Sequence, residues 1–446
     1  MVSRTRLPFV LAAMFILLSP LSVSTQETGK IVRVGKTSQV EVQPANGPAK
    51  YGRIAVTVLI VAFGLSSRGS FVAGPASKAI CAWAALFVLS GIWSTAPHYA
   101  LFHKSLFALV LLSGFTLVKC VRNLDELNRG LRFLSLFAGG AACVTFLAYL
   151  QGAAGGSTNG RMAMLGLNSN MLGMTAASLL ILCAYAAIND PSLTVKRLMI
   201  LPCLVLGIIL IGSGSRGCAL MALTGILFLA LPLVRRPAVL AGLGLSLLIT
   251  VYVAVEVLEV GGGNRLVKDL SKDTRGEVWR YVFKGYLKSP LIGTGWWTNN
   301  GTSWANTHNA YLQVLTESGP LGITLLALAL FTMLRSWKRN HAWLRKCRLP
   351  LNLSYLTAAL VVPVLLEGFA ESGVFMGSGV NALFLGMGVG LLDRTIGLVT
   401  GSSSGAGASA GPPGGQVGGR PNRISVFPPI VQRRGFPNFP QQPGAA

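Results

Sequence analysis

Long, unbroken apolar runs separated by short polar turns are the dominant pattern of the chain. A membrane-spanning helix needs about 20 mostly apolar residues. The runs that approach this length cover residues 7–24, 54–67, 79–93, 105–118, 133–150, 162–188, 198–213, 217–234, 238–258, 319–335, 352–370 and 377–398. Their apolar positions are continuous and do not alternate, which argues against a membrane β-barrel. The pattern predicts an all-α polytopic membrane protein with about twelve transmembrane helices.

The first apolar run allows two interpretations. Arg4 and Arg6 precede it, and the small residues Ser22 and Ser24 follow it. This arrangement is typical of a secretory signal peptide, but an uncleaved first span has the same features. In both cases we expect residues 25–53 to form a polar extracytoplasmic segment.

Composition agrees with a membrane protein, and the charge indicates its orientation. Hydrophobic residues make up 52% of the chain and charged residues 12%, against roughly 25% charged residues in soluble domains. The net charge of +24 would favour nucleic-acid binding in a soluble protein, but this chain has little water-exposed sequence to build a basic face. Most Lys and Arg residues fall in alternate turns, so the positive-inside rule predicts that both termini are cytoplasmic. Residues 25–53 do not follow this rule.

Two long hydrophilic regions interrupt the helical pattern. Residues 259–318 form a large extracytoplasmic loop, expected to be periplasmic, between the transmembrane helices of 54–258 and those of 319–398. Residues 400–446 are rich in Gly, Pro and Ser and basic, which predicts a disordered cytoplasmic tail near anionic headgroups. No two cysteines stand in a C-x-x-C spacing, which argues against a zinc or iron–sulfur site.

The centre of the large loop is predicted to be an amphipathic helix. Thr274 and Glu277 have the spacing of a capping box, and Pro290 ends the helix. Its apolar residues are Val278, Trp279, Val282, Phe283, Tyr286 and Leu287, and its basic residues are Arg280, Lys284 and Lys288. A helix of this kind is suited to the membrane interface.

Glycines and aromatic residues follow this helix. The segment Gly293-Thr-Gly295 predicts a turn, and Trp296 and Trp297 come directly after it. Tryptophan at this depth is either an interfacial anchor or a platform on which a sugar ring stacks.

The end of the loop contains the one histidine of the region, His308. Asn306 or Thr307 is expected to cap a short helix, with His308 in its first turn and Tyr311 one turn later. Histidine can accept a proton near neutral pH or bond to a phosphate. The alternative is an interfacial histidine with a structural hydrogen bond.

Arg161, Arg216 and Arg275 lie near the outer ends of predicted spans or open the loop helix. A charge close to the hydrocarbon is costly and is by default a functional hypothesis. The planar guanidinium can bind two phosphate oxygens at once, so arginines that converge from different loops would form a diphosphate clamp. The alternative is that each side chain extends to the lipid headgroups.

Taken together, these motifs resemble the O-antigen ligase/polymerase family of bacterial membrane proteins. The resemblance covers roughly residues 54–398, and the stretch from His308 into the next span is its most specific part. The matching motifs are Gly160-Arg161 with Asn168 and Asn170, Ser215-Arg216-Gly217, Arg275 with Trp279, Gly293-Thr-Gly295, and His308-Asn309-x-Tyr311-Leu312-x-x-Leu315-x-Glu317-x-Gly319.

The resemblance implies a glycosyltransferase C-like membrane enzyme in the bacterial inner membrane. Such an enzyme moves a glycan from an undecaprenyl diphosphate carrier to an acceptor hydroxyl on the periplasmic face, with no cofactor and no metal. Carried over by motif, Arg161, Arg216 and Arg275 would hold the diphosphate, and His308 would be the base or a phosphate partner. Trp296, Trp297 and Tyr311 are candidates for glycan contact. The implied partners are the lipid-linked glycan, the bilayer, a flippase and chain-length or export proteins, and not nucleic acid.

The family contains enzymes with different products. A polymerase joins lipid-linked repeat units into exopolysaccharide or O-antigen, whereas a ligase transfers the finished glycan to lipid A core or to a protein. The compact loop favours the polymerase. A lipid-linked glycan flippase is the alternative from another class, because it too would use basic residues, although transporters favour internal repeats and broken helices near the midplane.

Overall fold

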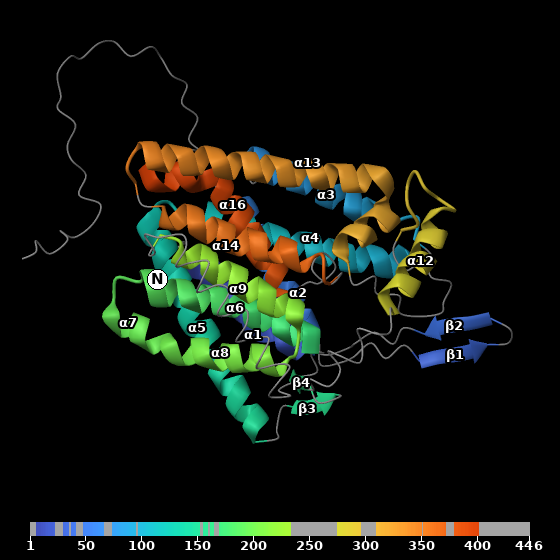
Figure 1. The fold of residues 1–446 in the computed structure, drawn as a ribbon, viewed down its shortest axis with the longest axis horizontal. Helices are drawn as coiled ribbons and strands as arrows, with labels where there is room; N and C mark the ends of the chain where they lie inside the picture. Colours follow the sequence, from blue (N-terminus) through green and yellow to red (C-terminus); the bar gives the residue numbers. More distant parts are fainter. Residues whose placement is uncertain are drawn as a thin grey trace, which may run out of the picture. The chain divides into compact units, whose positions relative to one another are not determined.

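The computed structural model describes thirteen ranges of the chain. These ranges are 6–22, 30–34, 37–41, 48–66, 74–94, 97–151, 155–158, 161–164, 169–232, 274–295, 309–349, 351–371 and 379–400. The helices are α1 (Arg6–Ser22), α2 (Pro48–Ser66), α3 (Pro75–Leu89), α4 (Pro97–Lys119), α5 (Leu124–Leu150), α6 (Ser169–Asn189), α7 (Leu193–Leu198), α8 (Ile200–Gly212), α9 (Arg216–Ala230), α12 (Thr274–Tyr286), α13 (Ala310–Lys346), α14 (Asn352–Glu367) and α16 (Val380–Thr400) (Figure 1). The described part of the chain is therefore mainly helical.

The helices lie where the apolar runs predicted them. Every predicted span that falls within the described ranges coincides with a helix, and the span at 238–258 lies outside them. By length and composition, the described ranges contain six helical segments that can cross a membrane: Ala100–Lys119, Leu124–Leu150, Ser169–Asn189, Leu193–Gly212, Ala310–Lys346 and Val380–Val399. The chain is thus a multi-pass membrane protein, whereas the count of twelve spans remains a prediction.

Two short hairpins depart from the all-α prediction. Strands β1 (Lys30–Val34) and β2 (Thr37–Glu41) pair antiparallel, as do β3 (Gly155–Thr158) and β4 (Arg161–Met164). The first hairpin lies in the polar segment predicted at 25–53, and α2 begins at Pro48, before the predicted boundary. The second occupies the start of the run at 162–188, where α6 begins only at Ser169. In both places hairpin hydrogen bonds satisfy the backbone of a stretch too polar or too glycine-rich to continue a spanning helix.

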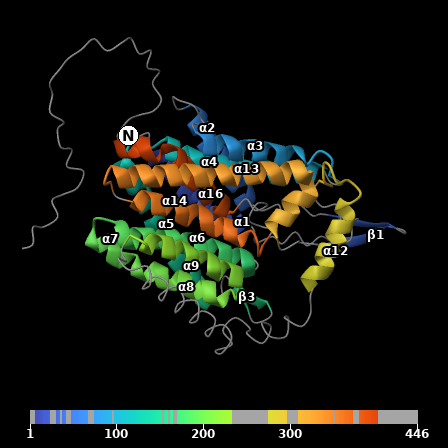
Figure 2. The same cartoon turned by 45° about the horizontal axis from the view of Figure 1, so that its top comes forward.

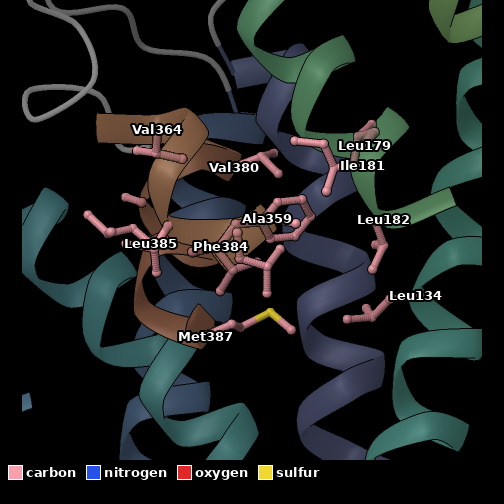
Figure 3. Packing of buried hydrophobic residues seen from close by; sticks show 14 of the residues in the cluster. Leu134, Leu179, Ile181, Leu182, Ala359, Val364, Val380, Phe384, Leu385 and Met387 are labelled. Carbon is pink, nitrogen blue, oxygen red and sulfur yellow. The ribbon is translucent and has the colours of Figure 1, made fainter. Parts of the chain in front are cut away.

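The helices pack into one continuous apolar core. Helix α4 contacts α16, α14 contacts α9, and α13 runs along α3 (Figures 1 and 2). Figure 3 shows side chains of α14 and α16, such as Ala359 and Phe384, close together in this core. Small residues set the closest approach, because a methyl group added at Gly386 would lie 2.1 Å from the carbonyl oxygen of Leu111. Close backbone contact at small residues is typical of helix pairs in membranes.

Two adjacent side chains of α16 supply hydrogen-bond partners to backbone groups at the ends of two other helices. The carboxylate of Asp393 accepts hydrogen bonds from the backbone N–H groups of Ala76 and Ser77, at 3.2 and 2.8 Å, in the first turn of α3. A guanidinium nitrogen of Arg394 donates to the carbonyl oxygens of Val118 and Lys119 at 2.5 and 2.7 Å. It also donates to that of Val121 at 2.8 Å, beyond the end of α4. Each charge has the sign that the helix dipole favours. We call this end of the bundle the Asp393 end.

Helix α13 connects the Asp393 end to the opposite end of the bundle. Asn340, in its C-terminal half, donates to the carbonyl oxygen of Leu392 at 2.5 Å. Glu317, in its first turns, pairs with Lys104 near the start of α4, the helix whose other end receives Arg394. We call this second end the Glu317 end.

The backbone of α13 is broken at Gly319, close to the Glu317 end. Gly319 has a φ of 68° and interrupts the helical geometry, and Pro320 follows it. Because proline has no N–H group, the carbonyl of Thr316 loses its helical donor. The backbone N–H of Thr294 replaces that donor at 2.8 Å and its hydroxyl adds a second bond at 2.9 Å. The N–H of Gly295 donates to the carbonyl of Glu317 at 3.0 Å.

The break explains the glycine turn of the large loop. Gly293 and Gly295 have φ values of 73° and 70°, which confirms the predicted turn. A methyl group at Gly295 would lie 2.6 Å from the backbone of Ser94, and one at Gly319 would lie 2.4 Å from the carbonyl oxygen of Leu291. The described residues after α12, up to Gly295, are therefore fixed by backbone hydrogen bonds to the broken helix, and not by their side chains alone.

Replacing Arg394 by methionine should destabilise the protein. The change leaves three carbonyl groups at the end of α4 without their shared donor, and hydrogen bonds to charged groups contribute about 1.5–3 kcal/mol. We expect a lower melting temperature in detergent for Arg394→Met than for Arg197→Met, which alters an exposed residue of α7. Equal melting temperatures for the two variants would contradict the capping role.

Replacing Gly319 by alanine should loosen the segment after α12. A non-glycine residue at positive φ costs about 1–3 kcal/mol, and the new methyl group would collide with the Leu291 carbonyl. We expect faster proteolysis between α12 and α13 together with a lower melting temperature. The control is Gly285→Ala in α12, where an added methyl group meets nothing within 4 Å. The prediction fails if both alanine variants resist protease as well as the parent protein.

Candidate active site

The Glu317 end contains a buried polar network that joins three helices. The Lys104 ammonium lies 3.0 Å from a carboxylate oxygen of Glu317 and donates to the Ser90 hydroxyl at 2.6 Å. The side-chain amide of Gln313 donates to the other carboxylate oxygen of Glu317 at 2.6 Å. Lys104 is 1% exposed and Glu317 4%, so each charge depends on these partners. The network fixes the start of α13 against α3 and α4.

Asn309 is the N-cap of α13. Its side-chain oxygen accepts hydrogen bonds from the backbone N–H groups of Tyr311 and Leu312, at 3.0 and 2.9 Å. The prediction that Asn306 or Thr307 caps this helix was therefore wrong, and so was the placement of His308 in the first helical turn. His308 precedes the cap, and its side chain lies outside the described residues.

The start of α13 is bound to the C-terminal end of α14. The backbone N–H of Ala310 donates to the carbonyl of Gly368 at 2.7 Å. The hydroxyl of Tyr311 donates to the carbonyl of Leu365 at 2.6 Å, and its ring packs on Phe369 at a centroid distance of 4.5 Å. These contacts give Tyr311 a structural role. Its predicted contact with the glycan stays a prediction. The contacts with α14 also explain the position of the cap, because the helix begins where Ala310 meets α14.

Arg216 is the first residue of α9. It follows a tight turn after α8, as the sequence predicted, and it is exposed. Gly217, the next residue, lies against the carboxylate of Glu367: a methyl group there would be 2.5 Å from one of its oxygens. Arg216 is therefore adjacent in sequence to a glycine that packs against a buried carboxylate of α14.

The hairpin that carries Arg161 lies beside the turn that carries Arg216. Strand β4, which begins at Arg161, contacts α6 and α8. Met162 packs on the last turn of α8, since a methyl group at Gly212 would lie 2.9 Å from its terminal carbon. The side chain of Arg161 is outside the description, but the backbone brings these two predicted diphosphate ligands to neighbouring elements.

Glu367 and Glu371 were not identified from the sequence. They follow one another by four residues at the end of α14, and both are buried. Glu371 accepts a hydrogen bond from the side-chain amide of Asn170 at 2.5 Å, in the first turn of α6. A signal was available, because the chain has only 14 acidic residues and acids next to an apolar run are functional candidates by default.

Helix α12 presents two different apolar faces. Val282 and Tyr286 are buried, and the helix contacts α13. The exposed face carries Trp279, Phe283 and Leu287 in one row and Arg280, Lys284 and Lys288 in the next. The sequence predicted a single apolar stripe. In the structure, part of this stripe is buried against the protein and the rest is exposed. Arg275 lies in the first turn of α12, and its side chain is not described.

Trp296 and Trp297 fall outside the described residues, as His308 does, so their predicted roles are not tested. Within the described ranges, no three His, Cys, Asp or Glu side chains come together in a way that would hold a metal ion.

A comparison with known protein families finds a match to one family model. Residues 201–327 match the family model described as O-antigen ligase, a segment that contains Arg216, Arg275 and His308. No curated protein matches the chain. The family and the apolar helices together indicate a multi-pass membrane enzyme that processes glycans. The match over residues 201–327 confirms the resemblance found in the sequence for that part of the chain.

Proposed function

We propose that the protein polymerises undecaprenyl-diphosphate-linked oligosaccharide repeat units into exopolysaccharide or O-antigen. The reaction takes place on the periplasmic face of the inner membrane, at the Glu317 end of the helices. Arg216, Arg161 and Arg275 hold the diphosphate, and His308 assists the acceptor hydroxyl.

One observation supports this assignment above the others. The end of α14 contacts both the first turn of α9, which begins at Arg216, and Ala310, which stands two residues after His308. Two motifs that lie about ninety residues apart in the sequence thus meet at one helix end. Both motifs belong to the segment that matches the family.

The chemistry required is the exchange of one C–O bond for another. The acceptor hydroxyl oxygen forms a bond to the anomeric carbon of the donor sugar, while the bond from that carbon to the diphosphate oxygen breaks. The hydroxyl proton passes to His308 as general base. Negative charge develops on the leaving diphosphate, where preorganised arginines stabilise it most.

The orientation follows from the charges of the two helix ends. Lys119, Arg132 and Arg394 gather at the Asp393 end, which the positive-inside rule assigns to the cytoplasm. The Glu317 end then faces the periplasm. The exposed row of α12 would rest on the acyl chains there, with its basic residues at the level of lipid phosphates.

A ligase is the second candidate, because the matching family model is described as O-antigen ligase. The same arginines and histidine would serve it, and only the acceptor would differ. The polymerase is preferred because the loop predicted at residues 259–318 is short in sequence and shows no enlargement for a protein acceptor.

His308→Ala and Arg216→Ala should each stop glycan transfer while the protein still inserts in the membrane. Loss of the base alone is expected to slow the reaction about 10²–10⁴-fold. The measurement is polymer length in cells at matched protein levels, with Arg197→Ala as a control that removes an exposed arginine of α7. Normal polymer in the His308 or Arg216 variant would refute the site.

Deletion of the protein should distinguish the possible products. Single repeat units that accumulate on the carrier without long chains indicate a polymerase. Long chains that stay on the carrier and are missing from lipid A indicate a ligase. Glycans trapped on the cytoplasmic side would indicate a flippase and would overturn the proposal.

The exposed row of α12 should be shielded by lipid. In spheroplasts treated with a membrane-impermeant maleimide, we expect slow labelling of Phe283→Cys and fast labelling of Lys284→Cys. Both positions are exposed and adjacent, so the pair is its own control. Equal fast labelling would contradict a membrane contact, and labelling of Lys284→Cys only in inverted vesicles would reverse the orientation.

A further inference from the structure

The carboxylate of Glu367 lies in an unusual position below the first turn of α9. It is 1% exposed, and the Cys218 thiol donates to one of its oxygens at 3.4 Å. Its other oxygen has no hydrogen-bond partner among the described residues. Only glycine at position 217 lets the carboxylate come so close, because a methyl group would lie 2.5 and 2.8 Å from its two oxygens.

The position of this carboxylate is fixed from several sides. The carbonyl of Gly368, directly after it, accepts the N–H of Ala310 at 2.7 Å. One turn later, Glu371 accepts the Asn170 amide at 2.5 Å. The end of α14 therefore joins the starts of α6, α9 and α13. Glu367 is the acidic side chain of this junction that lies against the start of α9.

We propose that Glu367 is a positioning residue, which fixes the first turn of α9 and thereby places Arg216 toward a polyprenyl diphosphate. The inference rests on the proposed function. A carboxylate near a helix N-terminus is stabilised by the helix dipole, and its burial makes the position of the turn specific. Glu367 acts through α9, and the phosphate is bound by Arg216 itself.

Three variants of the full-length protein in detergent test the proposal, with binding of farnesyl diphosphate as the measurement. Glu367→Gln keeps the shape and removes the charge. Gly217→Ala keeps both Glu367 and Arg216 but forces them apart, and Arg216→Lys keeps a charge but loses the planar fork. The controls are Gly207→Ala in α8, where a methyl group meets nothing within 4 Å, and Asp190→Asn, which weakens the partly exposed pair of Asp190 with Arg132.

We expect each of the three variants to weaken binding at least fivefold. Because Glu367 acts through Arg216, the double variant Glu367→Gln/Arg216→Lys should bind no more than about twofold worse than Arg216→Lys alone. The controls should bind as the parent does, even where Asp190→Asn lowers the melting temperature.

The failures can be told apart. If Arg216→Lys weakens binding but Glu367→Gln and Gly217→Ala only lower the melting temperature, Glu367 is merely structural and the inference is wrong. If the two substitutions weaken farnesyl diphosphate binding independently, so that their fold-losses multiply in the double variant, the inference is also wrong. If the parent does not bind farnesyl diphosphate, or binds farnesyl monophosphate equally well, the diphosphate site of the proposed function fails and the inference with it.

Discussion

Every backbone N–H and C=O group inside the apolar bundle must find a partner within the protein, because hydrocarbon offers none. This constraint determines what happens wherever a helix begins, ends or breaks. At the Asp393 end, adjacent side chains of α16 satisfy the first N–H groups of α3 and the last carbonyls of α4. At the break before Pro320, the turn at Thr294 supplies the donors that the helix lacks. Residues 294 and 295 are bonded to α13 because that helix is broken.

The same constraint concentrates polar chemistry at the Glu317 end. The end of a helix leaves backbone groups without helical partners, and these groups bond to polar side chains and neighbouring turns. The carbonyl of Gly368 is such a group, and it accepts the N–H of Ala310 at the start of α13. The buried pair of Lys104 and Glu317 then locks that start against α4. Arg216 and the start of α13, both within the matched segment, therefore lie at helix ends that contact neighbouring helices.

The sequence predicted the elements better than their junctions. Apolar runs located the helices, and the glycines at 293 and 295 located the turn, because both signals are local. The predicted cap of α13 was wrong. Asn309 is the cap because the helix begins where Ala310 contacts α14, and no local sequence pattern encodes that contact. The scarcity of acidic residues could have drawn attention to Glu367, but its contact with Gly217 could not be predicted, because the two are distant in the sequence. The hairpin at Arg161 was missed because its second strand overlaps the start of the apolar run at 162–188.

The two ends of the bundle differ in how completely their buried polar groups are satisfied. At the Asp393 end, Asp393 and Arg394 use their charges on helix termini. At the Glu317 end, an oxygen of Glu367 has no partner within the described residues, and Arg216 above it is exposed. A buried polar atom without a partner costs about 1–3 kcal/mol, and departures of this kind are expected at functional sites. The unpartnered oxygen lies beside the turn that carries Arg216, which is where the proposed function has the diphosphate bind.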